Sequence, residues 1–173
     1  MASLVEFFDI LSVKGPVSWS PNTARIRLTL NYKRIPHKTT FLSFADIADN
    51  HKALNITPNT VGMPFTCPAI LHHPSKSAIQ DSFPIAKYLD DTFTGPEHPT
   101  IFPTGSHALI TLTQNVLSTR VLPVILKLVV AKVPGILDVR VESTLYVLGR
   151  YGLVCQWRST VKTRKRSEGV EGV

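Results

Sequence analysis

Residues 66–93, TCPAILHHPSKSAIQDSFPIAKYLDDTF, decide the fold of this chain. Two β-prone pieces, residues 69–72 and 78–79, flank the turn-forming residues HPSKS, which predicts a β-hairpin. A helical pattern follows in SFPIAKYLDDTF, with Ser82 as its expected cap. The expected buried side of this helix is formed by Ile85, Ala86 and Leu89. The stretch therefore predicts two antiparallel strands followed by one amphipathic helix.

The residues upstream of the hairpin predict a β-α-β unit. Residues 4–11, LVEFFDIL, are apolar on both faces, as is typical of a central strand. Ser20 and Pro21 begin a helix, with Ser20 as N-cap and Pro21 at the first helical position. Its pattern places Ala24, Leu28 and Tyr32 on one stripe, with Ile26 and Leu30 beside it. Residues 37–47 alternate as a second strand does, and the two strands are expected to be parallel.

The order β-α-β, loop, β-β-α is the thioredoxin-like arrangement, an α/β fold with a mixed sheet and flanking helices. The loop is expected over residues 48–64, with one short helix in it. We expect the thioredoxin-like domain to span residues 1–94 and a Pro/Gly-rich linker to follow over residues 95–105.

The remainder divides into a helical part and a basic tail. Residues 106–137 predict an incomplete all-α region of two helices with a break near Pro123. The apolar run 121–137 is interpreted as a buried helix, and membrane insertion is disfavoured because prolines and lysines interrupt it. Residues 138–173 form a divergent tail with 7 basic and 4 acidic residues. Its core, residues 162–166, is interpreted as a solvated charge run, against the alternative of a nucleic-acid contact or nuclear address, because no aromatic residues interleave it.

Cysteine usage and the first residues narrow the class of protein. Cys67 and Cys155 form neither a CxxC pair nor a metal-ligand spacing, which disfavours a thioredoxin-like redox enzyme and predicts no metal site. The first residues lack the pattern of a signal peptide, so a cytoplasmic protein is expected.

Three motifs resemble the glutathione transferase family, and within it the fungal class related to ether-cleaving transferases. They are SPNTARIRLTLNYKRI at residues 20–35, TCPAIL at residues 66–71 and QDSFPIAKYLDD at residues 80–91. The resemblance covers residues 4–137 and implies a glutathione-binding domain followed by a helical acceptor domain. We expect that second domain to be truncated or altered here, since residues 138–173 show no resemblance to the family.

The resemblance makes Ser20 the candidate that activates the glutathione thiol, with Ser18 and Trp19 as weaker candidates. Lowering a thiol pKa from about 8.5 to about 6.5 requires about 2.7 kcal/mol. A serine at the N-cap offers both a hydroxyl hydrogen bond and the positive end of a helix dipole toward the thiolate.

The other two motifs imply where the rest of the tripeptide binds. Pro68 is the expected cis-proline, which presents the backbone of Cys67 to the peptide. Asp81 is expected to pair with the γ-glutamyl ammonium, and Ser82 with the α-carboxylate. Lys52 is a candidate for the glycyl carboxylate, together with His51, although a solvated surface role is favoured for both.

The leading hypothesis is therefore a glutathione transferase, in which the bound thiolate attacks a small hydrophobic electrophile. The alternative is a non-catalytic protein that binds glutathione or a hydrophobic ligand, suggested by the truncated second domain. The expected partners are glutathione as co-substrate and the electrophile. A homodimer is also compatible with the resemblance, whereas neither a nucleic acid nor a membrane is expected.

Overall fold

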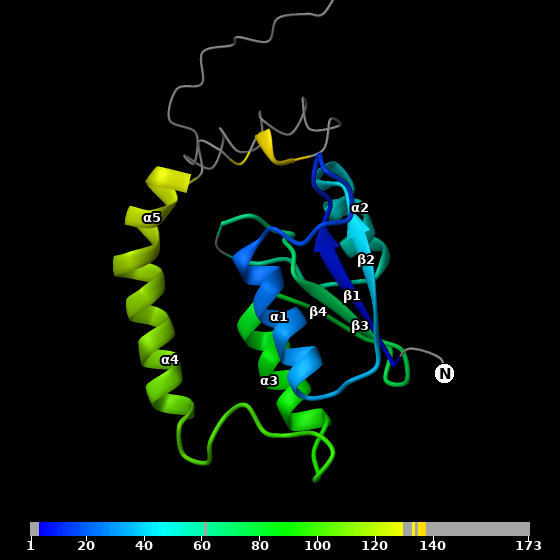
Figure 1. Ribbon diagram of the computed structural model, residues 1–173, viewed down its shortest axis with the longest axis vertical. Coiled ribbons are helices and arrows are strands. Elements are labelled where there is room, and N and C mark those ends of the chain that lie inside the picture. Colours follow the sequence, from blue (N-terminus) through cyan, green and yellow to red (C-terminus); the bar gives the residue numbers. More distant parts are fainter. Residues whose placement is uncertain (1–3, 61, 130–132, 134, 138–173) are drawn as a thin grey trace, which may run out of the picture.

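The computed structural model describes residues 4–60, 62–129, 133 and 135–137. A four-stranded sheet with the order β2-β1-β3-β4 lies at its centre (Figure 1). The strands are β1 (Val5–Ile10), β2 (His37–Leu42), β3 (Ala69–His72) and β4 (Ser77–Gln80). β1 pairs in parallel with β2 and antiparallel with β3, and β3 pairs antiparallel with β4. The predicted thioredoxin-like mixed sheet, including its hairpin, is confirmed.

β1 is buried on both faces because its apolar side chains alternate between two clusters. Val5 and Phe7 belong to one cluster, and Phe8 and Ile10 to the other. Successive side chains of a strand point to opposite faces of the sheet, so a strand that is apolar at both kinds of position needs a layer on each side. This requirement explains why helices flank the sheet.

The first layer consists of α1 (Pro21–Tyr32) and α3 (Ser82–Thr92). Ile85 and Leu89 of α3 are fully buried and Ala86 packs at their edge, as predicted. The prediction for α1 is correct in part, because Ile26 and Leu30 are fully buried whereas Leu28 and Tyr32 are exposed. Thr23 joins Ile26 and Leu30 in the buried stripe of this helix. These three follow the i, i+3, i+7 spacing of one helical face.

The second layer covers the other face of the sheet. A 3-10 turn, η1 (Phe44–Asp46), leads directly into α2 (Ile47–Ala53), so the short helix starts one residue before the predicted loop. Ile47 and Ile56 pack here against Phe8 and Ile10. Leu137 joins the same cluster, and the carbonyl of Ile136 accepts a hydrogen bond from Val13 in the β1–α1 loop. The described chain therefore ends beside the loop that precedes α1.

The connection between α3 and the next helix is held by one buried carboxylate. Asp90 of α3 pairs with Lys33 at 2.7 Å, and both side chains are almost completely buried. The same carboxylate accepts hydrogen bonds from the N–H groups of Ile101 and Phe102 and from the hydroxyl of Thr100. Burial alone would raise the pKa of Asp90, but these hydrogen bonds, with that from Lys33, lower it below its ordinary value. The connection is thus fixed to the first layer of helices.

The last helices form one column at the edge of the molecule (Figure 1). α4 (His107–Val116) and α5 (Leu122–Val129) are joined by a π-helical turn, η2 (Leu117–Val121), so the helix continues past Pro123 and the break predicted near this residue is absent. The expected burial of residues 121–137 is wrong for the described part of the helix, since Val124 is 62% exposed and Leu128 is 73% exposed. No second helical layer covers them among the described residues.

By length and composition, the helix His107–Ile125 could cross a membrane, and none of its most apolar window is buried. Core helices of soluble proteins pass the same criterion. The basic tail, residues 138–173, with its charge run and Cys155, lies outside the described residues.

Candidate functional site

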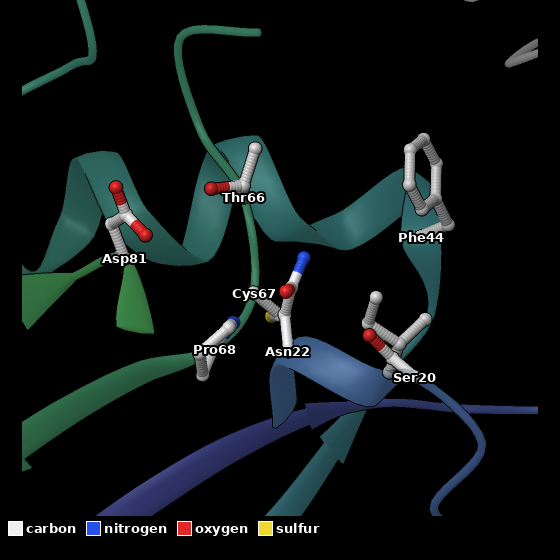
Figure 2. Close-up of a pocket in the computed structure, with 8 residues that line it drawn as sticks. Ser20, Asn22, Phe44, Thr66, Cys67, Pro68 and Asp81 are labelled. Atoms are coloured by element: carbon white, nitrogen blue, oxygen red, sulfur yellow. The ribbon is translucent and has the colours of Figure 1, made fainter. Parts of the chain in front are cut away.

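A cavity of about 220 Å³ opens where α1 and α3 begin. Ser20, Cys67, Pro68 and Asp81 all contribute to its lining, although up to 61 positions separate them in the sequence. The remaining lining residues are Ile10, Asn22, Phe44 and Thr66. Figure 2 shows the Ser20, Asn22, Thr66 and Asp81 side chains around one open space. The fold thus brings four of the predicted site residues together.

Ser20 occupies the N-cap position of α1, as predicted, but its side chain does not cap the helix. The Ser20 carbonyl instead accepts hydrogen bonds from the N–H of Ala24 and from the hydroxyl of Thr23. Ser20 is 7% exposed and still lines the cavity. Its hydroxyl is therefore available to a ligand at the positive end of the α1 dipole. An ordinary capping role does not account for this serine.

The peptide bond between Cys67 and Pro68 is cis, as predicted. Within the described residues, the main-chain N–H and carbonyl of Cys67 form no hydrogen bond. They can pair with the main chain of a bound peptide in the manner of an added strand. Burial raises the pKa of the Cys67 thiol far above its ordinary value, and the charge of Asp9 adds to the effect. The thiol stays neutral at physiological pH, which makes it a poor nucleophile.

Asp81 has the backbone angles φ +75° and ψ +138°, which non-glycine residues rarely adopt. Its N–H donates to the Pro68 carbonyl at 3.0 Å, and its own carbonyl accepts from the N–H of Ile85. Strain of this kind typically costs about 1 to 3 kcal/mol and clusters at ligand sites. The unusual conformation places the Asp81 carboxylate at the cavity (Figure 2).

Asp81, and not Ser82, is the N-cap residue of α3, which corrects the prediction. Ser82 is the first residue of the helix, half-buried, and lies outside the set that lines the cavity. Serine is a common N-cap residue, which favoured Ser82 in the sequence. In the structure α3 already begins at Ser82, so the preceding residue, Asp81, is the N-cap. A role for Ser82 toward a ligand stays a prediction.

Lys52 and His51 lie on α2 and behave differently from each other. The Lys52 side chain is 63% exposed, does not line the cavity and lies 3.5 Å from the carboxylate of Asp49. The surface role favoured for His51 is wrong, because this residue is completely buried and its Nε2 lies 3.0 Å from the Thr66 carbonyl. Burial lowers the pKa of His51, and the hydrogen bond to Thr66 opposes the shift only in part.

Sequence reasoning missed Asn22, Thr66, Ile10 and Phe44 as lining residues. Asn22 had a usable signal, since it stands two positions after the N-cap, in the first turn whose end faces the site. Thr66 directly precedes the cis-proline dipeptide and shares its exposure to the cavity. Ile10 and Phe44 carry no such signal, because only the packing of β1 and η1 brings them there.

Comparison with known proteins shows which families this chain is similar to. Residues 19–92 match the family model described as glutathione S-transferase, N-terminal domain. A glutathione S-transferase-like protein of Aspergillus flavus, ustS, is 41% identical over 117 residues, which cover 62% of this chain and 41% of that protein.

Two solved structures show the same fold. A glutathione S-transferase of Ceriporiopsis subvermispora, solved in complex with glutathione, superposes with a TM-score of 0.77 at 30% identity over 87% of this chain and 61% of that chain. The glutathione transferase GSTFuA3 of Phanerochaete chrysosporium superposes with a TM-score of 0.74 at 29% identity over 86% of this chain and 61% of that chain. The chain thus spans less than two thirds of these relatives. Residues 19–92 of this chain are thus similar in sequence to the N-terminal domain of glutathione S-transferases, and the described fold is similar to that of these fungal enzymes.

Proposed function

We propose that this chain is a glutathione transferase that binds glutathione in the cavity at the start of α1 and α3. The observation that carries the proposal is the Ser20 hydroxyl, which lines the cavity at the N-cap position without capping the helix. The family model and a fungal relative solved with glutathione support the choice of ligand.

In the proposed complex, the γ-glutamyl ammonium pairs with the Asp81 carboxylate. The α-carboxylate lies at the start of α3, where the N–H groups of the first turn and the Ser82 hydroxyl can donate to it. The main chain of the tripeptide pairs with the free N–H and carbonyl of Cys67. These contacts place the cysteinyl sulfur toward the start of α1.

The chemistry at that sulfur follows from the charge that must be stabilised. Ser20 donates a hydrogen bond to the thiolate, and the N-terminus of α1 adds its dipole. A hydrogen bond to a charged group contributes about 1.5 to 3 kcal/mol, comparable to the stabilisation that a pKa near 6.5 requires. The thiolate then attacks an electrophilic carbon, an S–C bond forms, and the leaving group departs with its electron pair. Asn22 is a second polar group at the same place.

Replacing Ser20 by alanine tests the proposal. We expect Ser20→Ala to lower kcat for a generic aromatic electrophile by about tenfold or more, because a hydrogen bond to an anion is lost. The dissociation constant for glutathione should change by less than about threefold, since the hydroxyl acts on the sulfur and not on the tripeptide backbone. The pH at which the rate reaches half its maximum should rise.

Ser18→Ala is the matched control, because the Ser18 hydroxyl is buried two residues away and does not line the cavity. It should leave both constants unchanged. Equal losses of rate and affinity in Ser20→Ala would contradict the catalytic role. Glutathione binding without any conjugation by the unaltered protein would support the non-catalytic alternative.

A further inference from the structure

The segment between α2 and β3 forms one wall of the cavity without regular secondary structure of its own. Its described residues 55–60 and 62–68 contain neither helix nor strand, yet Thr66, Cys67 and Pro68 line the cavity. A few main-chain hydrogen bonds, such as that from Asp81 to Pro68, hold this wall, and side chains that bind its main chain supply further hydrogen bonds. Two buried side chains, from Gln80 and His51, do so.

Gln80 makes three hydrogen bonds to this segment. Its Oε1 accepts from the N–H of Thr66 at 2.9 Å, and its Nε2 donates to the carbonyls of Thr57 and Pro64 at 2.8 and 2.9 Å. The side chain is 6% exposed, so water does not compete effectively for these groups. A carboxamide is the side chain that both accepts one and donates two hydrogen bonds in this way. The pattern is specific to glutamine at this position.

His51 binds the other main-chain group of Thr66, its carbonyl. Its Nε2 lies 3.0 Å from the Thr66 carbonyl, and because a carbonyl only accepts, Nε2 carries the proton. Both main-chain groups of Thr66 are thus bound by buried side chains. We call the side chains of Gln80 and His51 the Thr66 clamp.

Gln80 also connects this wall of the cavity with Asp81, which lines the cavity at the start of α3. It is the last residue of β4, pairs with Ala69 directly after the cis-proline, and precedes Asp81 in the chain. Asp81 in turn donates its N–H to the Pro68 carbonyl. A displacement of Gln80 would therefore move the Cys67 edge and the Asp81 carboxylate together.

We propose that Gln80 is a positioning residue that fixes the Thr66–Cys67 edge for the tripeptide and so sets the affinity for glutathione. The inference rests on the proposed function, because it assigns Gln80 a role in binding glutathione. The Thr66 clamp touches neither Ser20 nor Asn22 in any described hydrogen bond. It consequently acts on binding and not on the reactivity of the bound sulfur.

The test compares Gln80→Leu and Gln80→Glu with the unaltered protein. Gln80→Leu keeps a similar volume and removes all three hydrogen bonds. We expect KM and the calorimetric dissociation constant for glutathione to rise on the order of tenfold, with kcat at saturating glutathione within about threefold. Tyr88→Phe is the control, because it removes the two hydrogen bonds of the Tyr88 hydroxyl, to His72 and Ser75, at the other end of the β3–β4 hairpin. It should leave both constants unchanged.

Gln80→Glu adds a readout that a purely structural role would not produce. An ionised carboxylate would face the carbonyls of Thr57 and Pro64 and repel them, whereas the protonated acid can donate to one of them. Its affinity for glutathione, relative to the unaltered protein, should therefore improve from pH 8 to pH 6. If Gln80→Leu does not fold, this variant carries the test.

Unchanged affinity in a folded Gln80→Leu, or a fall in kcat at unchanged affinity, would overturn the inference. Absence of glutathione binding in the unaltered protein would instead overturn the proposed function. In that case hydrogen exchange decides whether the clamp exists, since the Thr66 amide, which donates to Gln80 Oε1, should exchange faster in Gln80→Leu than in Tyr88→Phe. Equal protection in both variants would overturn the clamp as well.

Discussion

The thioredoxin-like half and the α4–α5 column differ in what they do with apolar residues. In the first, residues from every strand and from α1 to α3 meet in two clusters on opposite faces of the sheet. In the second, Leu112 is 60% exposed, and neither α4 nor η2 has a buried residue. α5, LPVILKLV, is more apolar in sequence than α3, SFPIAKYLDDT. Apolar composition therefore produces a core only where a second apolar surface faces it.

The boundary between the two regions is polar and well anchored. Lys33 donates to Asp90 and to the Pro99 carbonyl, and the Lys33 carbonyl contacts His98 Nδ1 at 2.7 Å. Asp90 in turn binds the main chain at residues 101 and 102. The connecting segment thus belongs structurally to the first region, although no helix or strand lies in it. The part of the chain whose apolar side chains are exposed therefore begins at α4.

The largest contrast should come from removing one apolar side chain in each region. Phe7 is completely buried, and the guanidinium of Arg27 lies over its ring. We expect Phe7→Ala to lower the free energy of unfolding by about 3 to 5 kcal/mol, because it leaves a cavity between α1 and the sheet. Leu112→Ala should change the free energy of unfolding by less than about 0.5 kcal/mol, because the Leu112 side chain is already largely exposed to solvent. Urea unfolding of both variants measures the difference, and a large loss in Leu112→Ala would show that α4 is covered in solution.

A smaller loss is expected at the boundary. Asp90→Asn keeps the shape of the side chain but leaves Lys33 buried without its counter-charge, which should lower the free energy of unfolding by about 3 kcal/mol near neutral pH. The folded-state pKa of Asp90 is lowered, so its contribution is complete above the unfolded-state pKa and is lost as the pH falls through the folded-state pKa.

Unfolding measured from pH 7 down to pH 2 therefore distinguishes the ion pair from mere packing. The difference between Asp90→Asn and the unaltered protein should shrink in the acid range. The double variant Lys33→Met/Asp90→Leu should recover much of the loss, because it removes both buried charges. A constant difference at all pH values would contradict the role of the pair.

The smallest effect is expected from removing residues 138–173. All described residues that line the cavity lie between Ile10 and Asp81, so no proposed contact to glutathione is lost. The dissociation constant for glutathione should stay within about threefold of that of the intact chain, because the proposed contacts come from other residues. Retention on immobilised glutathione and calorimetry measure it. Loss of binding on deletion would show that the first region depends on the tail.

The sequence predicted local elements well where the pattern is local. The hairpin follows from two β-prone pieces around a turn, and the start of α1 from Ser20 and Pro21. The errors concern which face of a helix is buried. The pattern places Leu28 and Tyr32 on the main stripe of α1 with Ile26 and Leu30 beside it, but only the latter pair is buried. His51 is likewise buried and not at the surface, because neither pattern says which side of a helix the sheet will cover.

The candidate site shows the same division. Ser20, Cys67, Pro68 and Asp81 were identified from motifs, and the structure brings them to one cavity. Lys52 is not among the residues that line it. Gln80 and His51 gave no signal as partners of Thr66, since their hydrogen bonds join residues that are 14 and 15 positions apart.

The sequence by itself determined the order of the elements, the cis-proline dipeptide and the residue types available at each helix start, because these depend on neighbouring residues. Only the tertiary structure decided that the Ser20 hydroxyl is free of a capping role and that Asp81 takes the N-cap of α3. It also decided that the apolar residues of α4 lie exposed. Each of these depends on which surfaces meet across the sheet, and burial and hydrogen bonding are properties of that meeting and not of the chain alone.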